Sequence, residues 1–150
     1  MADITISDVN IFQGERGFIK GSLYISVDRI RAVVPASEEK SECSAQGITL
    51  PGRYVLPGLV DIHTHGNSGS DFSDGSREGL HEMGKYLAAH GITSFAPTSM
   101  TLPYEKLKTV FRTAAEYMHD RPDDGARVAG IHMEGPFSPK RRKVPKTESI

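Results

Sequence analysis

The chain has 150 residues and a formal net charge of −1, with 37% hydrophobic and 25% charged residues. This balance is typical of a globular protein and excludes a collagen, a coiled coil and a fully disordered chain. No apolar run reaches the roughly 20 residues that a membrane span requires. The near-neutral charge gives the whole molecule no strong attraction for nucleic acid or a membrane. The length argues against a complete two-domain enzyme.

The single cysteine, Cys43, excludes an internal disulfide and is typical of a protein from a reducing compartment. Residues 1–6 lack the basic and apolar segments of a secretory signal. We therefore expect a cytoplasmic protein. Cys43 lies in polar sequence with no base nearby, which argues against a catalytic nucleophile.

The first third of the chain predicts a β-meander of short strands. β-branched residues nearly alternate with other residues in 4–11 and again in 23–34, and glycines mark the turns. Residues 35–47 are small and polar and predict a loop, and residues 48–55 predict a further short strand. A sheet of this size is too small to form a sound core by itself.

The second part of the chain predicts alternating strands and helices. Residues 59–62 are a short apolar run, typical of a strand buried on both faces. Apolar residues recur at helical spacing in 76–90 and 103–119, and short apolar runs follow in 92–96 and 128–133. The order β-α-β-α-β predicts a parallel sheet with right-handed crossovers. An open doubly wound sheet and a (β/α)₈ barrel both begin in this way.

The last segment, residues 138–150, lacks apolar periodicity. It holds five basic residues against one acidic residue, Glu148, whereas the rest of the chain is net negative. This shift indicates a basic tail outside the packed fold, which we expect to be disordered. The run 139–146 is also typical of a nuclear-import or polyanion-binding patch, although no aromatic residue is interleaved to stack on bases.

Two strand ends carry residues that can bind a metal. His63 and His65 directly follow the first apolar strand, and residues i and i+2 of a strand point to the same side. Glu134 follows the third strand and is expected at the same edge of the sheet. Two histidines and a carboxylate are a suitable set for a divalent metal. His132 is expected deeper on its strand, where it either supports the site or packs.

Other polar residues give weaker signals. The Gly- and Ser-rich segment 66–72 predicts a flexible loop whose amides can approach an anion. Thr98, Ser99 and Thr101 either line the same edge or cap the following helix. Three helical histidines are expected to be solvated or helix-terminal: His81, His90 and His119.

Three motifs follow one another in the chain. They are Asp-Ile-His-Thr-His-Gly within residues 54–72, His-Gly-Ile-Thr-Ser-Phe-Ala-Pro-Thr at 90–98, and His-Met-Glu-Gly-Pro-Phe at 132–137. Together they resemble the N-acetylglucosamine-6-phosphate deacetylase family of metal-dependent amidohydrolases. The resemblance implies an α/β fold, in which residues 1–55 are the N-terminal part of a small β-sandwich. Residues 56–137 are then the first part of an incomplete (β/α)₈ barrel.

The resemblance also implies an activity, namely hydrolysis of the N-acetyl group of N-acetylglucosamine 6-phosphate to glucosamine 6-phosphate and acetate. It implies His63, His65 and Glu134 as ligands of one or two divalent ions, such as zinc or iron. The partners implied are an amino-sugar phosphate and further copies of the protein. The family also needs two later histidine ligands and an aspartate general base, which this chain lacks. We therefore assign no catalytic residue and expect weak metal binding and no activity from the chain alone.

Two alternatives to an active deacetylase remain open at this point. One is a truncated, inactive fragment that self-associates, and the other is a small non-enzymatic binding module with a basic tail. In the family, the segment after Phe137 continues with a Lys-rich turn and a Gly-Ala-His or Gly-Ala-Gln segment. Residues 143–150 permit codons that give Gly-Ala-Gln in another reading frame. We therefore expect a single-base frameshift near Phe137 or Ser138, which the nucleotide sequence would test.

Overall fold

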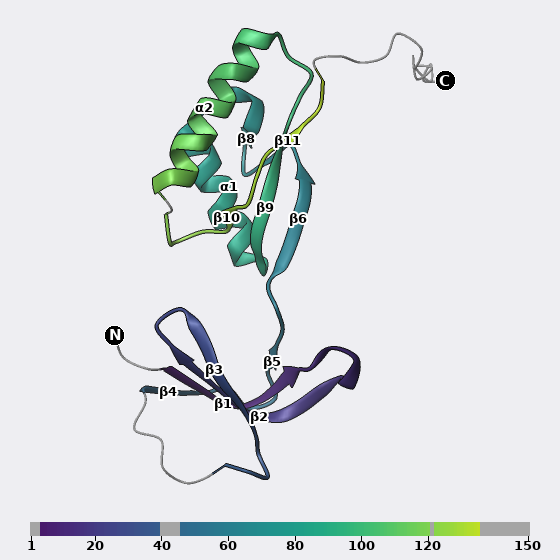
Figure 1. Cartoon of the computed structure of the whole chain (residues 1–150), viewed down its shortest axis with the longest axis vertical. Coiled ribbons are helices and arrows are strands. Elements are labelled where there is room, and N and C mark those ends of the chain that lie inside the picture. The colour runs from purple at the N-terminus through teal and green to yellow at the C-terminus, as the bar shows by residue number, and fades with distance from the viewer. Residues whose placement is uncertain (1–3, 40–45, 121, 136–150) are drawn as a thin grey trace. The chain divides into compact units, whose positions relative to one another are not determined.

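The structure, a computed structural model, describes residues 4–39, 46–120 and 122–135. The chain divides into two compact units, Met1–Pro57 and Gly58–Ile150 (Figure 1). Cys43 and the tail from 138 to 150 lie outside the described residues, as does the proposed frameshift position. Within the described part of the chain, no helix is both long and apolar enough to cross a membrane.

The first unit contains one five-stranded sheet. Its strands are β1 (Ile4–Phe12), β2 (Phe18–Ser26), β3 (Arg29–Pro35), β4 (Gln46–Thr49) and β5 (Tyr54–Val55). The first three form the predicted antiparallel meander. β4 and β5 depart from it, because both pair with β1 and run parallel to it. The prediction of one strand over 48–55 was therefore wrong, since a turn at Gly52, with a φ of 72°, separates two strands.

The core of the first unit is small, as expected for a single sheet. Only Val9, Ile11 and Leu23 form its fully buried apolar cluster among the residues described. Five half-buried side chains pack against this cluster: Ile6, Ile19, Ile25, Val33 and Val55.

The second unit contains the predicted β-α-β-α-β order. Its main elements are β6 (Leu59–Thr64), α1 (Arg77–Ala89), β9 (Ile92–Ser99), α2 (Tyr104–Asp120), β10 (Arg127–Val128) and β11 (His132–Met133). β6 lies on one side of β9, β10 and β11 lie on the other, and all run parallel to β9. The predicted third strand is thus divided in two. Figure 1 shows both helices beside this sheet.

Helix α1 is bounded by local sequence signals and held by an apolar stripe. The Ser76 hydroxyl accepts a hydrogen bond from the Gly79 amide at 3.0 Å, which satisfies an amide of the first turn. Gly91, with a φ of 82°, follows the last turn. The stripe joins a buried cluster with β9 and α2: Phe72, Leu80, Met83, Leu87, Phe95, Val110, Ala114, Tyr117, Ala126 and Val128.

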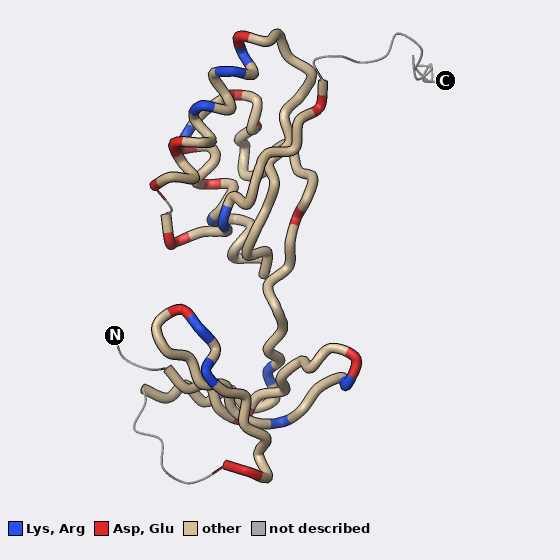
Figure 2. The backbone as a smooth tube through the Cα atoms, viewed as in Figure 1, with Lys and Arg blue, Asp and Glu red and all other residues tan. Residues whose placement is uncertain are grey.

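Strand β6 is not buried on both faces, contrary to the sequence prediction. Leu59, Val60 and Ile62 are 63%, 62% and 72% exposed. The reason is that β6 pairs only with β9 among the described residues, so one edge and much of its apolar surface remain uncovered. The strand also carries little charge, since Asp61 is the only Asp, Glu, Lys or Arg residue in it (Figure 2).

This uncovered strand predicts self-association of the 150-residue chain, because an unprotected apolar edge is a template for pairing. Ile62→Lys is expected to shift the chain towards the monomer, since a charged side chain opposes contact between two such edges. Tyr104→Lys, at an exposed helical position, is the matched control. Sedimentation velocity over a concentration series measures the effect. A wild-type chain that stays monomeric throughout would contradict the prediction.

Both strands beside β9 contain an irregularity at the level of Pro97, which has no N–H for the sheet ladder. Between Asp61 and Thr64, β6 advances by three residues while β9 advances by two. Between Val128 and His132, the chain advances by four residues while β9 advances by three. At this level each outer strand therefore has one extra residue relative to β9, as in a β-bulge.

His81 is not simply solvated, as had been predicted for the helical histidines. Its Nε2 lies 3.2 Å from the Asp124 carboxylate, and its Nδ1 lies 3.2 Å from the Tyr117 hydroxyl. Because a carboxylate only accepts, His81 Nε2 is the donor to Asp124. His81 thus connects α1, α2 and the turn before β10. His90 and His119 are exposed, as expected.

Burial raises the pKa of Tyr117 above its usual value of 10, and the Asp124 carboxylate contributes in the same direction. The unfolded chain therefore ionises this phenol at lower pH than the folded chain does. The neutral Tyr117 phenol therefore stabilises the fold below pH 10. This stabilisation is lost as the pH rises through the pKa of Tyr117 in the folded chain. Tyr117→Phe is expected to reduce the alkaline fall in unfolding free energy, while exposed Tyr104→Phe leaves it unchanged. Denaturant unfolding at a series of pH values measures both.

Candidate metal centre

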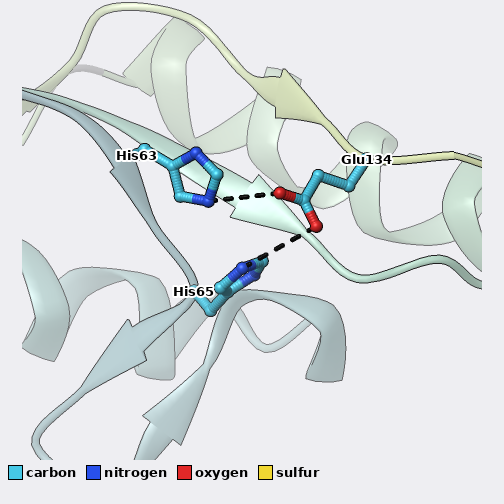
Figure 3. A group of neighbouring side chains, drawn as sticks. All are labelled: His63, His65 and Glu134. Carbon is cyan, nitrogen blue, oxygen red and sulfur yellow. Dashed lines mark ion pairs between the residues drawn. The ribbon is translucent and has the colours of Figure 1, made fainter. Parts of the chain in front are cut away.

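The three residues predicted as metal ligands lie together at one edge of the second unit (Figure 3). His63 Nε2 is 3.3 Å from Glu134 Oε1, and His65 Nε2 is 4.0 Å from Glu134 Oε2. One ligand atom from each residue lies within 4.8 Å of the other two. Across the described ranges, no other group of three histidine, cysteine or acidic side chains meets this condition.

The topology of the sheet explains the meeting of these side chains. β6 and β11 flank β9 and run parallel to it, so their carboxyl ends reach the same edge. His63 lies in β6 and His65 directly follows it, whereas Glu134 directly follows β11. Asp61 fixes the backbone at this end of β6, since its Oδ1 accepts a hydrogen bond from the His63 amide at 3.0 Å.

The buried end of β9 orients His65 and Glu134. The Thr98 carbonyl accepts a hydrogen bond from His65 Nδ1 at 3.1 Å, which leaves the Nε2 lone pair facing Glu134. Metal-binding histidines commonly donate their second ring N–H in this way. The Ser99 hydroxyl accepts from the Glu134 amide at 3.4 Å. Thr98 and Ser99 are both fully buried, so they lie beneath this edge.

His132 lies beside His63 and is exposed, so the expectation of a deeper position was wrong. Its ring centroid is 4.6 Å from that of His63, in an edge-to-face arrangement. His132 Nδ1 lies 3.1 Å from the Ile62 carbonyl, to which it donates. The side chain therefore reaches across from β11 to β6.

The segment 66–72 is a β-hairpin rather than the predicted flexible loop. β7 (Gly66–Asn67) and β8 (Ser70–Asp71) pair in antiparallel fashion. The Asp71 side chain accepts from the Ser73 amide at 2.7 Å and caps a short 3₁₀ turn, Phe72–Asp74. Sequence reasoning missed Asn67, whose side-chain nitrogen and oxygen are buried with no hydrogen-bond partner among the described residues.

The donor atoms fit a divalent metal ion. Two ligand atoms each about 2.0–2.1 Å from a tetrahedral ion lie roughly 3.3 Å apart, and the His63–Glu134 pair has this separation. The three side chains are between 35% and 45% exposed, so solvent reaches the site. Three protein ligands can hold an ion and leave a position for water or a substrate.

The model of the Amidohydrolase family matches residues 54–149, which is more than half of the chain. The chain belongs to the amidohydrolase family. This family is metal-dependent, and the matched region contains all three candidate ligands. The family resemblance that the three sequence motifs predicted is confirmed.

The named relatives of this chain share one more specific description. The chain is 31% identical to the N-acetylglucosamine-6-phosphate deacetylase of Vibrio furnissii over 119 residues, which are 79% of this chain and 30% of that protein. It is 34% identical to the Bacillus subtilis (strain 168) deacetylase over 142 residues, 92% of this chain and 35% of that protein. The crystal structure of the Pasteurella multocida deacetylase has a TM-score of 0.78 at 26% identity, covering 90% of this chain and 35% of its own. This chain thus spans about a third of the length of these relatives.

Proposed function

We propose that this chain contributes part of the metal centre of an N-acetylglucosamine-6-phosphate deacetylase. His63, His65 and Glu134 are the proposed ligands of a divalent ion. The observation that carries the proposal is the convergence of three donor atoms within 4.8 Å from two separate strand ends. The names of the relatives support the choice of reaction and of an amino-sugar phosphate as substrate.

The chemistry follows from the donor set. A divalent ion held here would polarise an amide carbonyl and acidify a bound water. The Thr98 carbonyl keeps the proton on His65 Nδ1, so that Nε2 is free to donate its lone pair. Glu134 supplies a negative charge that favours binding of a cation. The exposure of these side chains leaves room for a substrate amide.

The same proposal assigns the architecture. Residues 1–55 form the N-terminal part of a small β-sandwich, and residues 56–137 form the first strands and helices of a (β/α)₈ barrel. The parallel β-α-β-α-β order and the similarity to the Pasteurella multocida deacetylase support this assignment. The uncovered edge of β6 supports it as well, since a closed barrel pairs both edges of every strand.

We further propose that these 150 residues bind a metal ion but do not deacetylate at a useful rate. Among the described residues, Glu134 is the only carboxylate in the ligand group, and it is assigned to the metal. The ligand group therefore holds no second carboxylate that could act as a general base. Because general acid–base catalysis raises reaction rates roughly 10²–10⁴-fold, we expect a correspondingly slow reaction.

Calorimetric titration of the purified, metal-free chain with Zn²⁺ and Co²⁺ tests the first part, and acetate release from N-acetylglucosamine 6-phosphate tests the second. We expect binding of divalent metal and no turnover above the blank. Absence of metal binding would refute the proposed centre. Turnover free of host enzyme would refute the expected inactivity, and turnover that appears only on mixing with the remainder of a relative would indicate a split enzyme.

A further inference from the structure

We propose that His132 is a positioning residue for His63 and does not itself bind the metal. Its ring packs against the His63 imidazole and thereby holds His63 Nε2 in the direction of Glu134. The inference rests on the proposed function, because it assigns a support for one of the proposed ligands.

His132 is itself held in place by two contacts. Its Nδ1 donates to the Ile62 carbonyl at 3.1 Å, at the irregularity where β6 departs from its regular register with β9. The backbone of His132 is also fixed, because it pairs with fully buried Thr98 in β9. His132 is therefore attached to β6 through its ring and to β9 through its backbone.

His63 needs support from a neighbouring side chain. Its side chain is 45% exposed, so the imidazole would otherwise sample several rotamers, and ordering it on metal binding costs conformational entropy. His65 is held by a hydrogen bond from its own ring to the sheet. His63 instead contacts two edge-to-face rings. The His132 ring is nearer, with centroids 4.6 Å apart, and the His65 ring is at 5.2 Å, while Asp61 holds only the backbone of His63.

His132 is not one of the proposed metal ligands. The group whose donor atoms lie within 4.8 Å of one another contains His63, His65 and Glu134, and His132 is not a member. Its Nδ1 is committed to a backbone carbonyl. The ring thus contributes contact area and orientation, as the supporting residues of other metal sites do.

Two variants separate the ring from the hydrogen bond. His132→Asn retains a side-chain donor near the position of Nδ1 but lacks the ring, whereas His132→Phe retains an aromatic ring but lacks the donor. His90→Asn is the matched control, because exposed His90 also bonds a backbone carbonyl through Nδ1, that of Tyr86, at 2.7 Å. For each variant of the 150-residue chain, we would measure Zn²⁺ affinity, the visible spectrum of bound Co²⁺ and thermal unfolding.

Loss of a supporting residue costs about 10–100-fold in metal affinity. We expect His132→Asn to weaken Zn²⁺ binding by at least about 10-fold and to change the Co²⁺ spectrum, with the midpoint of thermal unfolding unchanged. His132→Phe should recover most of the affinity, and His90→Asn should match the wild type. Wild-type affinity in His132→Asn would overturn the inference, as would a loss in His132→Phe equal to that in His132→Asn.

A measurement on the metal-free chain separates this inference from the proposed function. The ring carbon–proton resonances of His63, assigned by comparison with His63→Gln, should shift in His132→Asn, because the neighbouring aromatic ring is lost. If the wild type binds no metal while these resonances shift, the metal centre is wrong and the packing of His132 on His63 stands. If metal binds and the resonances do not shift, the positioning role is wrong.

Discussion

Replacing Glu134 with glutamine is expected to abolish most of the metal affinity of this chain. The substitution keeps the size of the side chain but removes the only negative charge among the three proposed ligands. The loss should exceed the roughly 10–100-fold that removal of a supporting residue costs, because Glu134 contributes a donor atom itself. Calorimetric titration with Zn²⁺ at one fixed pH measures the change.

Glu82→Gln is the control for this substitution, since Glu82 is an exposed helical glutamate that pairs with Lys85 at 3.1 Å. It removes the same charge from the chain without touching the site, so affinity should stay at the wild-type value. Equal losses in Glu134→Gln and Glu82→Gln would show that net charge alone governs metal binding. The double variant His65→Ala, Glu134→Gln should lose little beyond Glu134→Gln, because ligands of one ion act as a unit.

Phe95→Ala is expected to have the largest effect on the stability of the second unit. Phe95 is 0% exposed and lies in β9, where it packs in the buried cluster formed with α1 and α2. Truncation of a buried phenylalanine removes transfer free energy and leaves a cavity, at a cost of about 3–5 kcal/mol. This is a large part of the ~5–15 kcal/mol that stabilises an ordinary domain.

Urea denaturation followed by circular dichroism at 222 nm measures this loss. Both α-helices of the described chain belong to the second unit, so the helical signal reports on that unit. Ile62→Ala is the comparison, because Ile62 lies on the neighbouring strand and is 72% exposed. Its effect should stay within about 0.5 kcal/mol, as for other surface substitutions. Similar losses in the two variants would show that the buried cluster does not hold this unit together.

Local patterns in the sequence predicted the elements of the second unit well. The helical spacing of apolar residues identified α1 and α2, because these stripes are what each helix buries. The sequence also predicted that His63, His65 and Glu134 lie close together, because parallel strands bring their carboxyl ends to one edge of the sheet. The assignment of these three as metal ligands stays a prediction until binding is measured.

The features that sequence reasoning missed depend on pairing between distant segments. The parallel pairing of β4 and β5 with β1 joins residues far apart in the chain, and no local period encodes a partner. The exposure of β6 depends on whether another segment covers it, and the apolar run of β6 reads the same whether the strand is covered or uncovered. The bond from His132 to Ile62 spans 70 positions and requires the irregular register beside Pro97.

That irregular register has a consequence for how this region tolerates insertions and deletions. The extra residue between Val128 and His132 decides which side chain emerges at the edge of the sheet. Deleting one residue from 129–131 would restore even pairing, draw the chain back by one position and place Met133 opposite Thr98 in place of His132. Met133 and Glu134 would then each point to the opposite face. Within residues 129–131, a substitution is therefore expected to disturb the metal site less than a deletion.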